Sequence, residues 1–172
     1  MQAITHFFSG IFMTLLLQVI PMPGWLRFVL LFPIGIMLHF IIDAIAKMTY
    51  HPPEPLTKDK FWVTWHVIIF GGSVFVAIWF WVPYFWGMLA SIVPDIYDWG
   101  IIRGVRAYQK HKLGDNYENK SEFMKGHEFH PWVDKFRNKY LEFLPNWNFQ
   151  KKGIIPELVI WSACIFAVII LP

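Results

Sequence analysis

The sequence has little charge and almost no cysteine. Asp, Glu, Lys and Arg make up only 16% of its 172 residues, whereas a soluble domain carries about 25%. Cys164 is the one cysteine, so a disulfide within the chain is impossible, and we expect this thiol to fill apolar space in the last helix. The shortage of charge excludes an ordinary soluble domain and indicates a protein surrounded by lipid.

Apolar runs make up most of the chain. The composition is 56% hydrophobic and 19% aromatic, and a helix needs about 20 apolar residues to cross a bilayer. The segments that approach this length are 3–20, 25–46, 61–82 and 153–172, and we expect a shorter span over 84–102. The first has no basic residues before it and no small-residue cleavage site after it, so we expect a retained span rather than a signal peptide. We predict an all-α integral membrane protein with about five transmembrane helices, residues 1–172 forming a single helical membrane domain.

The long polar segment covers residues 103–152. Apolar residues in 131–144 recur at helical spacing with Lys and Arg between them, which predicts an amphipathic helix. Such a helix lies either at the cytoplasmic membrane interface or on the protein's own loops. Five spans would put this segment and residues 47–60 on the same side as the N-terminus. Among the Lys and Arg residues of the loops, only Arg27 would lie on the opposite side. The positive-inside rule therefore predicts a cytoplasmic N-terminus and a cytoplasmic segment 103–152.

Acidic and histidine side chains within the apolar runs all fall toward the cytoplasmic end of the predicted spans. They are His6, His39, Asp43, His66, Asp95, Asp98 and Glu157. His39 and Asp43 are four residues apart and share a helical face. Pro94 removes a helical hydrogen bond beside Asp95 and Asp98, so we expect a looser helix there. Because an unpaired buried carboxylate costs several kcal/mol, this one-sided placement indicates a polar functional site.

Imidazole and carboxylate groups together are typical ligands of Zn, Mn or non-haem Fe, or of Mg where carboxylates and water dominate. The predicted metal ligands are His6, His39, Asp43, His66, Asp95, Asp98, His127 and His130. The last two stand in a loop that either caps the site or forms a solvated turn. The candidate catalytic groups are Asp95, Asp98 and His66, because a divalent metal with a nearby base supports hydrolysis.

Arg103 and Arg106 follow the two acids closely in sequence. A guanidinium matches the oxygens of a phosphate, so we predict that they bind phosphate; the alternative is the ordinary basic flank of a span. Taken singly, His6 also suits the headgroup region, and Glu157 suits a helix N-terminus. We expect membrane lipid as a partner, a lipid-linked or small phosphoester as substrate, and no nucleic acid.

Three short motifs resemble the predicted membrane-bound metal-dependent hydrolases of bacteria and archaea. The motifs are Thr5-His6 followed by Gly10, the His39–Asp43 helix, and Gly87–Ala90 leading to Pro94-Asp95. The resemblance implies a metal-dependent hydrolase in a bacterial or archaeal cytoplasmic membrane. The chain departs from the family in lacking its His-Arg-Gly…Thr-His-Ser segment and in having Trp99 where a histidine follows the second acid.

Two other functions remain open at this point. Adjacent antiparallel spans would bring His39 and His66 to similar depths, which suits a haem with two imidazole ligands. Alternatively, the chain is an accessory or scaffold subunit whose acids are neutralised by cations of other protein subunits. A haem leaves Asp43 and Asp95 without a role, so the hydrolase is the preferred prediction.

Overall fold

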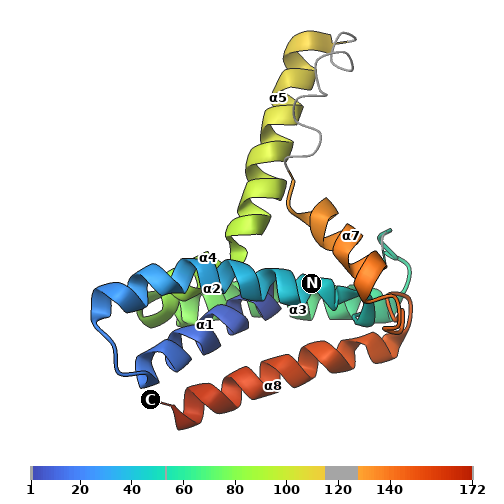
Figure 1. The fold of residues 1–172 in the computed structure, drawn as a ribbon. Helices are drawn as coiled ribbons and strands as arrows, with labels where there is room; N and C mark the ends of the chain where they lie inside the picture. The colour runs from blue at the N-terminus through green and yellow to red at the C-terminus, as the bar shows by residue number, and fades with distance from the viewer. Residues whose placement is uncertain (1, 53, 115–127, 172) are drawn as a thin grey trace.

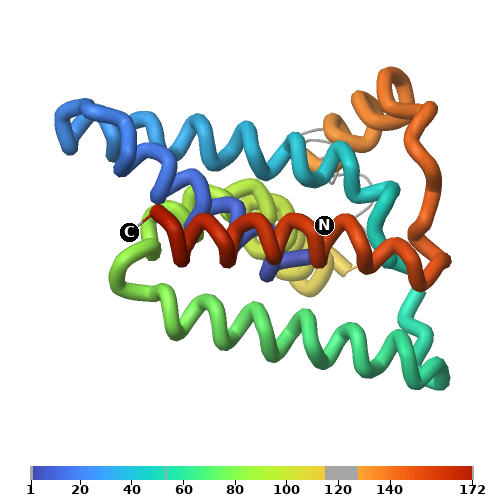
Figure 2. Tube along the Cα trace, turned by 90° about the horizontal axis from the view of Figure 1, so that it is seen from below, coloured from blue at the N-terminus to red at the C-terminus, as the bar shows by residue number. Residues whose placement is uncertain are grey.

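The computed structural model describes residues 2–52, 54–114 and 128–171, and within them it contains helices and no strand. Figures 1 and 2 show a bundle in which successive helices run in alternating directions. Its members are α1 (Ala3–Val19), α2 (Gly24–Ala44), α3 (Lys60–Trp79), α4 (Trp81–Asp95) and α8 (Ile154–Ile170). Helix α1 contacts each of the other four and forms the centre of the bundle. The predicted all-α class is confirmed for the described residues.

Three helices are long and apolar enough to cross a membrane: α2, α3 and the segment Lys151–Ile170 that contains α8. Helix α1 has 17 residues and α4 has 15, which correspond to about 25 Å and about 22 Å against a hydrocarbon core of about 30 Å. The predicted number of about five is therefore too high by this criterion. Helix α1 ends at Val19, just before Pro21 and Pro23, and the α-helical form of α4 ends at Asp95, directly after Pro94.

Helices α1 and α4 cross at two glycines. A Cβ atom on Gly10 would overlap the backbone carbonyl of Gly87, and a Cβ on Gly87 would overlap that of Gly10. One turn further along α4, Ser91 Oγ donates a hydrogen bond of 2.6 Å to the carbonyl oxygen of His6. The close approach of the two backbones therefore fixes the first turn of α1 against the last turns of α4.

Helix α4 changes form where Pro94 interrupts it. Pro94 has no N–H to donate to the carbonyl of Ala90, and the chain continues as a π-helical segment, η2 (Ile96–Ile102), before α5 (Arg103–Leu113). In Figure 1, α5 leads away from the bundle. The looser helix expected beside Asp95 is thus a wider helical turn, a form common at functional sites.

Helix α7 (His130–Tyr140) corresponds to the amphipathic helix predicted over 131–144. It packs against α2. It begins one residue earlier than predicted, with Pro131 in its first turn, where the missing N–H costs nothing. It ends four residues earlier than predicted, in a turn closed by a 3.1 Å bond from the Leu144 N–H to the Leu141 carbonyl, because Pro145 cannot donate the next helical hydrogen bond.

The connection after α2 pairs with the connection before α8. Tyr50 donates its backbone N–H to the carbonyl of Gly153 at 3.0 Å, and Trp147 donates to the carbonyl of Lys47 at 2.9 Å. A Cβ on Gly153 would lie 2.5 Å from the Tyr50 nitrogen, so this contact requires glycine. The pairing includes the short helices η1 (Ala46–Met48) and η5 (Lys151–Gly153), and it closes the end of the bundle near the site.

Candidate metal centre

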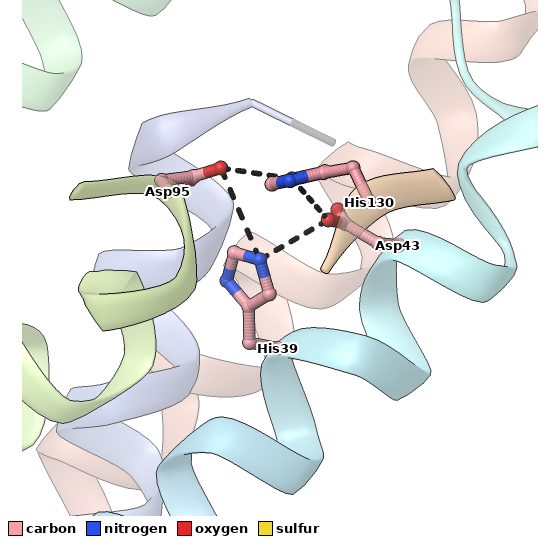
Figure 3. A group of neighbouring side chains, drawn as sticks. All are labelled: His39, Asp43, Asp95 and His130. Carbon is pink, nitrogen blue, oxygen red and sulfur yellow. Dashed lines mark ion pairs between the residues drawn. The ribbon is translucent and has the colours of Figure 1, made fainter. Parts of the chain in front are cut away.

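Four side chains from α2, α4 and α7 converge at one point, as Figure 3 shows. They are His39, Asp43, Asp95 and His130, and one ligand atom from each lies within 4.8 Å of all the others. Nε2 of His130 lies 3.1 Å from Oδ2 of Asp43 and 3.1 Å from Oδ1 of Asp95. Nε2 of His39 lies 3.1 Å and 3.9 Å from the same two oxygens. Ligands bound tetrahedrally at about 2.0–2.1 Å are separated by about 3.3 Å, so the group can hold one metal ion.

The two histidines are oriented by hydrogen bonds from their other ring nitrogens. Nδ1 of His39 lies 2.7 Å from the carbonyl oxygen of Ser91. A carbonyl only accepts, so Nδ1 donates to it, and Nε2 faces the centre. Nδ1 of His130 lies 2.6 Å from Oδ2 of Asp98. A carbonyl or carboxylate behind each imidazole is the usual support of metal-binding histidine.

Burial makes the centre costly without a ligand. His39 is fully buried, and its Nε2 faces the carboxylates of Asp43 and Asp95 at 3.1 Å and 3.9 Å. Buried charged groups are costly unless they are paired or coordinate a metal. The side chains of Asp95 and His130 are 28% and 24% exposed, so the centre is open on their side. A metal ion would therefore pair with the buried groups and stay accessible from the exposed side.

His6 lies behind the four-residue group. Its ring stacks on that of His39 with centroids 4.1 Å apart, and its Nε2 lies 3.2 Å from Oδ1 of Asp43, the oxygen that faces away from His39 and His130. The side chain is fully buried, and its Nδ1 has no hydrogen-bond partner within the described part of the chain. His6 therefore contacts the Asp43 carboxylate rather than the point where the four ligand atoms meet.

Asp98, predicted as a metal ligand and catalytic group, occupies a supporting position. Its Oδ2 contacts Nδ1 of His130, and its carboxylate also accepts hydrogen bonds from the backbone N–H groups of Phe129 at 3.1 Å and His130 at 2.8 Å. These N–H groups belong to the start of α7, where a helix leaves donors unsatisfied. Asp98 therefore both caps α7 and orients His130.

His66 is not brought to the centre. Its Nδ1 lies 2.8 Å from the carbonyl oxygen of Trp62, and its ring stacks on the Trp62 ring with centroids 3.9 Å apart. Glu157 is fully buried in α8, away from the four-residue group. His127 lies outside the residues that the structure describes. Of the histidines predicted as ligands, the four-residue group includes His39 and His130.

Both predicted phosphate-binding arginines are held by neighbouring side chains. The Arg103 guanidinium lies 3.4 Å from the ring centroid of Trp99, which is a cation–π contact. Nη1 of Arg106 lies 2.6 Å from Oε1 of Glu128. Trp99 lines the same pocket as Asp43, Asp95 and His130, so Arg103 is connected to the centre through the Trp99 side chain.

The pocket in front of the centre, which we call the polar pocket, has a volume of about 470 Å³. Its lining includes Asp43, Asp95, His130, Asp134, Arg137 and His51. Arg137 donates from Nη1 to the Asp43 carbonyl oxygen at 3.4 Å and from Nη2 to Asp134 at 2.6 Å. Arg137 was not among the predicted site residues, although its spacing of seven residues from His130 places both on one face of a helix.

The acidic surroundings control the charge of His130. Burial lowers its pKa, but hydrogen bonds to three carboxylates outweigh burial and raise the pKa to about 10. These carboxylates belong to Asp43, Asp95 and Asp98. In the absence of a metal, His130 therefore carries a proton at neutral pH, and a metal ion must displace it.

We expect metal binding to release about one proton per ion at neutral pH, and the apparent affinity to rise up to about tenfold per pH unit below pH 10. The reason is that proton and metal compete for Nε2 of His130. Titration calorimetry in two buffers with different ionisation enthalpies measures the proton count. The same binding heat in both buffers would contradict this prediction.

Comparisons of the chain with protein-family models, with curated proteins and with solved structures find no match. The function must therefore be inferred from the site itself. The structure provides two histidines and two aspartates that can hold a metal ion, in a helical protein with three helices long and apolar enough to cross a membrane.

Proposed function

We propose that the protein is a membrane-embedded metal-dependent hydrolase that acts on a phosphoester at the cytoplasmic surface. The observation that carries this proposal is the convergence of four ligand atoms within 4.8 Å at the mouth of a polar pocket. The carboxylate and carbonyl behind the two histidines support it, since they hold both rings in the orientation that metal binding needs. The resemblance of three short motifs to predicted metal-dependent hydrolases agrees with it.

The side chains around the polar pocket have different roles in the proposed hydrolysis. A divalent ion held by the candidate ligands would lower the pKa of a water molecule and polarise the phosphoryl group. Arg137 lines the pocket and binds phosphate oxygens through its paired N–H groups. Asp95, the more exposed of the two candidate carboxylate ligands, accepts the proton of the attacking water. The water oxygen bonds to phosphorus, the phosphorus–oxygen bond to the alcohol breaks, and the alcohol leaves with the proton that Asp95 accepted.

The arrangement of the helices supports a site at the cytoplasmic surface. Lys47 follows α2, Lys60 begins α3, and Lys151 and Lys152 precede α8, all toward the end of the bundle that holds the centre. Lys and Arg near the ends of spans favour the cytoplasmic side. In this topology α1 and α4 also lie within the bilayer, and their shorter lengths leave space for the centre at its surface.

Metal reconstitution tests the proposed function. The protein is purified in detergent, stripped with a chelator and loaded separately with Zn, Mn, Fe or Mg, and hydrolysis of p-nitrophenyl phosphate is measured. We expect about one ion per chain by elemental mass spectrometry and activity that returns with at least one metal. Stoichiometric metal without hydrolysis of soluble or lipid phosphoesters would favour an accessory subunit with a structural ion. A Soret band in the purified protein would instead favour haem.

Arg137→Ala provides a sharper form of this test. Because the guanidinium lines the pocket but is not among the candidate metal ligands, we expect unchanged metal content and a rise in KM of about tenfold or more, as for a lost charged hydrogen bond. Lys135→Ala, on an exposed part of α7, is the matched control and keeps the original KM. Equal KM values for the two variants would contradict a phosphate-binding role for Arg137.

A further inference from the structure

Beside the metal centre, α2 and α7 enclose an apolar groove of about 790 Å³. Its lining includes Met37, Phe40, Ile41, Phe129, Trp132 and Phe136. The volume falls within the range of about 300–1,000 Å³ that is usual for small-molecule sites. We call this feature the acyl groove, for the occupant argued below.

Helix α2 has two faces with different chemistry. His39 and Asp43 point to the metal centre. The groove is lined from α2 by residues 37, 40, 41 and 44, at the i, i+3, i+4, i+7 spacing of one helical stripe. The candidate ligands and the apolar stripe therefore occupy adjacent faces of the same two turns.

Helix α7 repeats this division. His130, Asp134 and Arg137 line the polar pocket, whereas residues 129, 132, 133 and 136 line the groove, again at helical stripe spacing. Val133 lines both. The polar pocket and the acyl groove are therefore neighbours on either side of one helix.

The two features meet near a pair of aromatic rings. Phe40 and Phe129 have ring centroids 5.6 Å apart. Phe40 directly follows the candidate ligand His39 in sequence, and Phe129 directly precedes the candidate ligand His130. A molecule with its apolar part against these rings therefore has its adjoining polar part close to the metal centre.

The groove continues the lipid-facing surface of α2. Met37 and Ile41 are 53% and 51% exposed, and α2 is one of the three helices long and apolar enough to span a membrane. A lipid chain in the bilayer thus reaches the groove laterally, without passing through water. The cation Arg137 and the candidate metal site in the polar pocket complement a phosphate at the other end of the same molecule.

We propose that the acyl groove binds an acyl chain of a membrane lipid whose phosphate headgroup lies in the polar pocket, so that the substrate class is a lipid phosphate ester. This inference rests on the proposed function for its catalytic part. Its binding part requires only that an acyl chain be held between α2 and α7.

Photolabelling tests the binding part without reference to activity. The metal-loaded protein is placed in phosphatidylcholine vesicles containing phosphatidic acid with a diazirine in the middle of one acyl chain, irradiated, and digested for mass spectrometry. We expect the label to concentrate on the α2 and α7 segments that line the groove. Labelling spread evenly over α2, α3 and α8 would overturn the proposal, since it would report only the surrounding bilayer.

Ile41→Trp tests the effect on hydrolysis, because an indole at this half-exposed position fills the groove. We expect labelling of α7 to fall at least fivefold and the KM for long-chain phosphatidic acid to rise about tenfold. Hydrolysis of p-nitrophenyl phosphate and metal content should stay within twofold of the original. Ile68→Trp is the matched control, since Ile68 on α3 is similarly exposed at 48%, and it should change none of these quantities.

The outcomes separate the groove from the catalytic proposal. Concentrated labelling without hydrolysis of any phosphoester supports the groove and counts against the hydrolase. Normal hydrolysis of both substrates by Ile41→Trp, with labelling unchanged, overturns the groove and leaves the hydrolase intact.

Discussion

Asp43→Asn is expected to abolish metal binding while the helical bundle stays folded. The Asp43 carboxylate contacts three histidines, with its oxygens 3.1–3.2 Å from nitrogens of His6, His39 and His130. An amide has nearly the same shape, so no cavity forms, but it supplies a neutral oxygen and removes one negative charge. The loss of metal affinity should exceed the roughly 10–100-fold that follows removal of a supporting residue.

Asp59→Asn is the control for this substitution. Asp59 accepts a 2.8 Å hydrogen bond from the Phe61 N–H at the start of α3, and asparagine caps a helix about as well as aspartate. Metal per chain is measured by mass spectrometry alongside thermal unfolding in detergent. Equal metal content in Asp43→Asn and Asp59→Asn would exclude the proposed centre.

Asp95→Asn separates metal loss from unfolding. Its side chain is 28% exposed, so it is less able to disturb packing than the buried Asp43. We expect it to lose most of its metal and to melt within a few degrees of the unaltered protein. Full metal content in folded Asp95→Asn would remove Asp95 from the ligand set.

Gly10→Ala is expected to have the largest effect on stability. The atoms that its Cβ would overlap belong to the Gly87 backbone carbonyl, which cannot turn aside as a side chain can, so α1 and α4 must separate. Overpacking of this kind costs about 1–3 kcal/mol or more, which lowers the unfolding midpoint by about 2–12 °C for a chain of this size. Metal affinity should fall as well, because the crossing positions Ser91 behind His39.

Gly71→Ala, in the middle of α3, is the control for the crossing. Among the described residues, no atom outside the neighbouring backbone of α3 itself lies within 4 Å of a Cβ at Gly71, and alanine favours a helix by about 1 kcal/mol over glycine. Its melting temperature should match or slightly exceed the original. Two glycine variants with the same melting temperature would contradict the close crossing of α1 and α4.

Spacing along single helices predicted part of the centre. The four-residue interval between His39 and Asp43 fixes their common direction whatever the rest of the fold does. Asp95 was predicted as a site residue because a carboxylate in an apolar run is costly. His130 was predicted because it stands beside an amphipathic helix. The all-helical class followed from the long apolar segments.

The remaining assignments depend on distances between elements, which spacing does not encode. His66 was expected in the centre because of its depth in α3, but depth leaves the rotation of a helix about its axis undetermined, and the side chain stacks on Trp62. Asp98 was expected to be a ligand, but the π-helical turn places it behind His130. Arg137 was overlooked because its role depends on how α7 packs against α2.

The dual contact of Asp98 links the order of α7 to the metal centre. One carboxylate accepts from the backbone at the start of α7 and from the ring of His130, so docking of the helix and presentation of the ligand are the same conformational event. By thermodynamic reciprocity, the factor by which docking of α7 raises metal affinity equals the factor by which a bound metal favours docking. If the proposed lipid binds between α2 and α7, it would favour docked α7 and so raise the metal affinity of the centre, and the bilayer would then take part in the equilibrium that assembles the site.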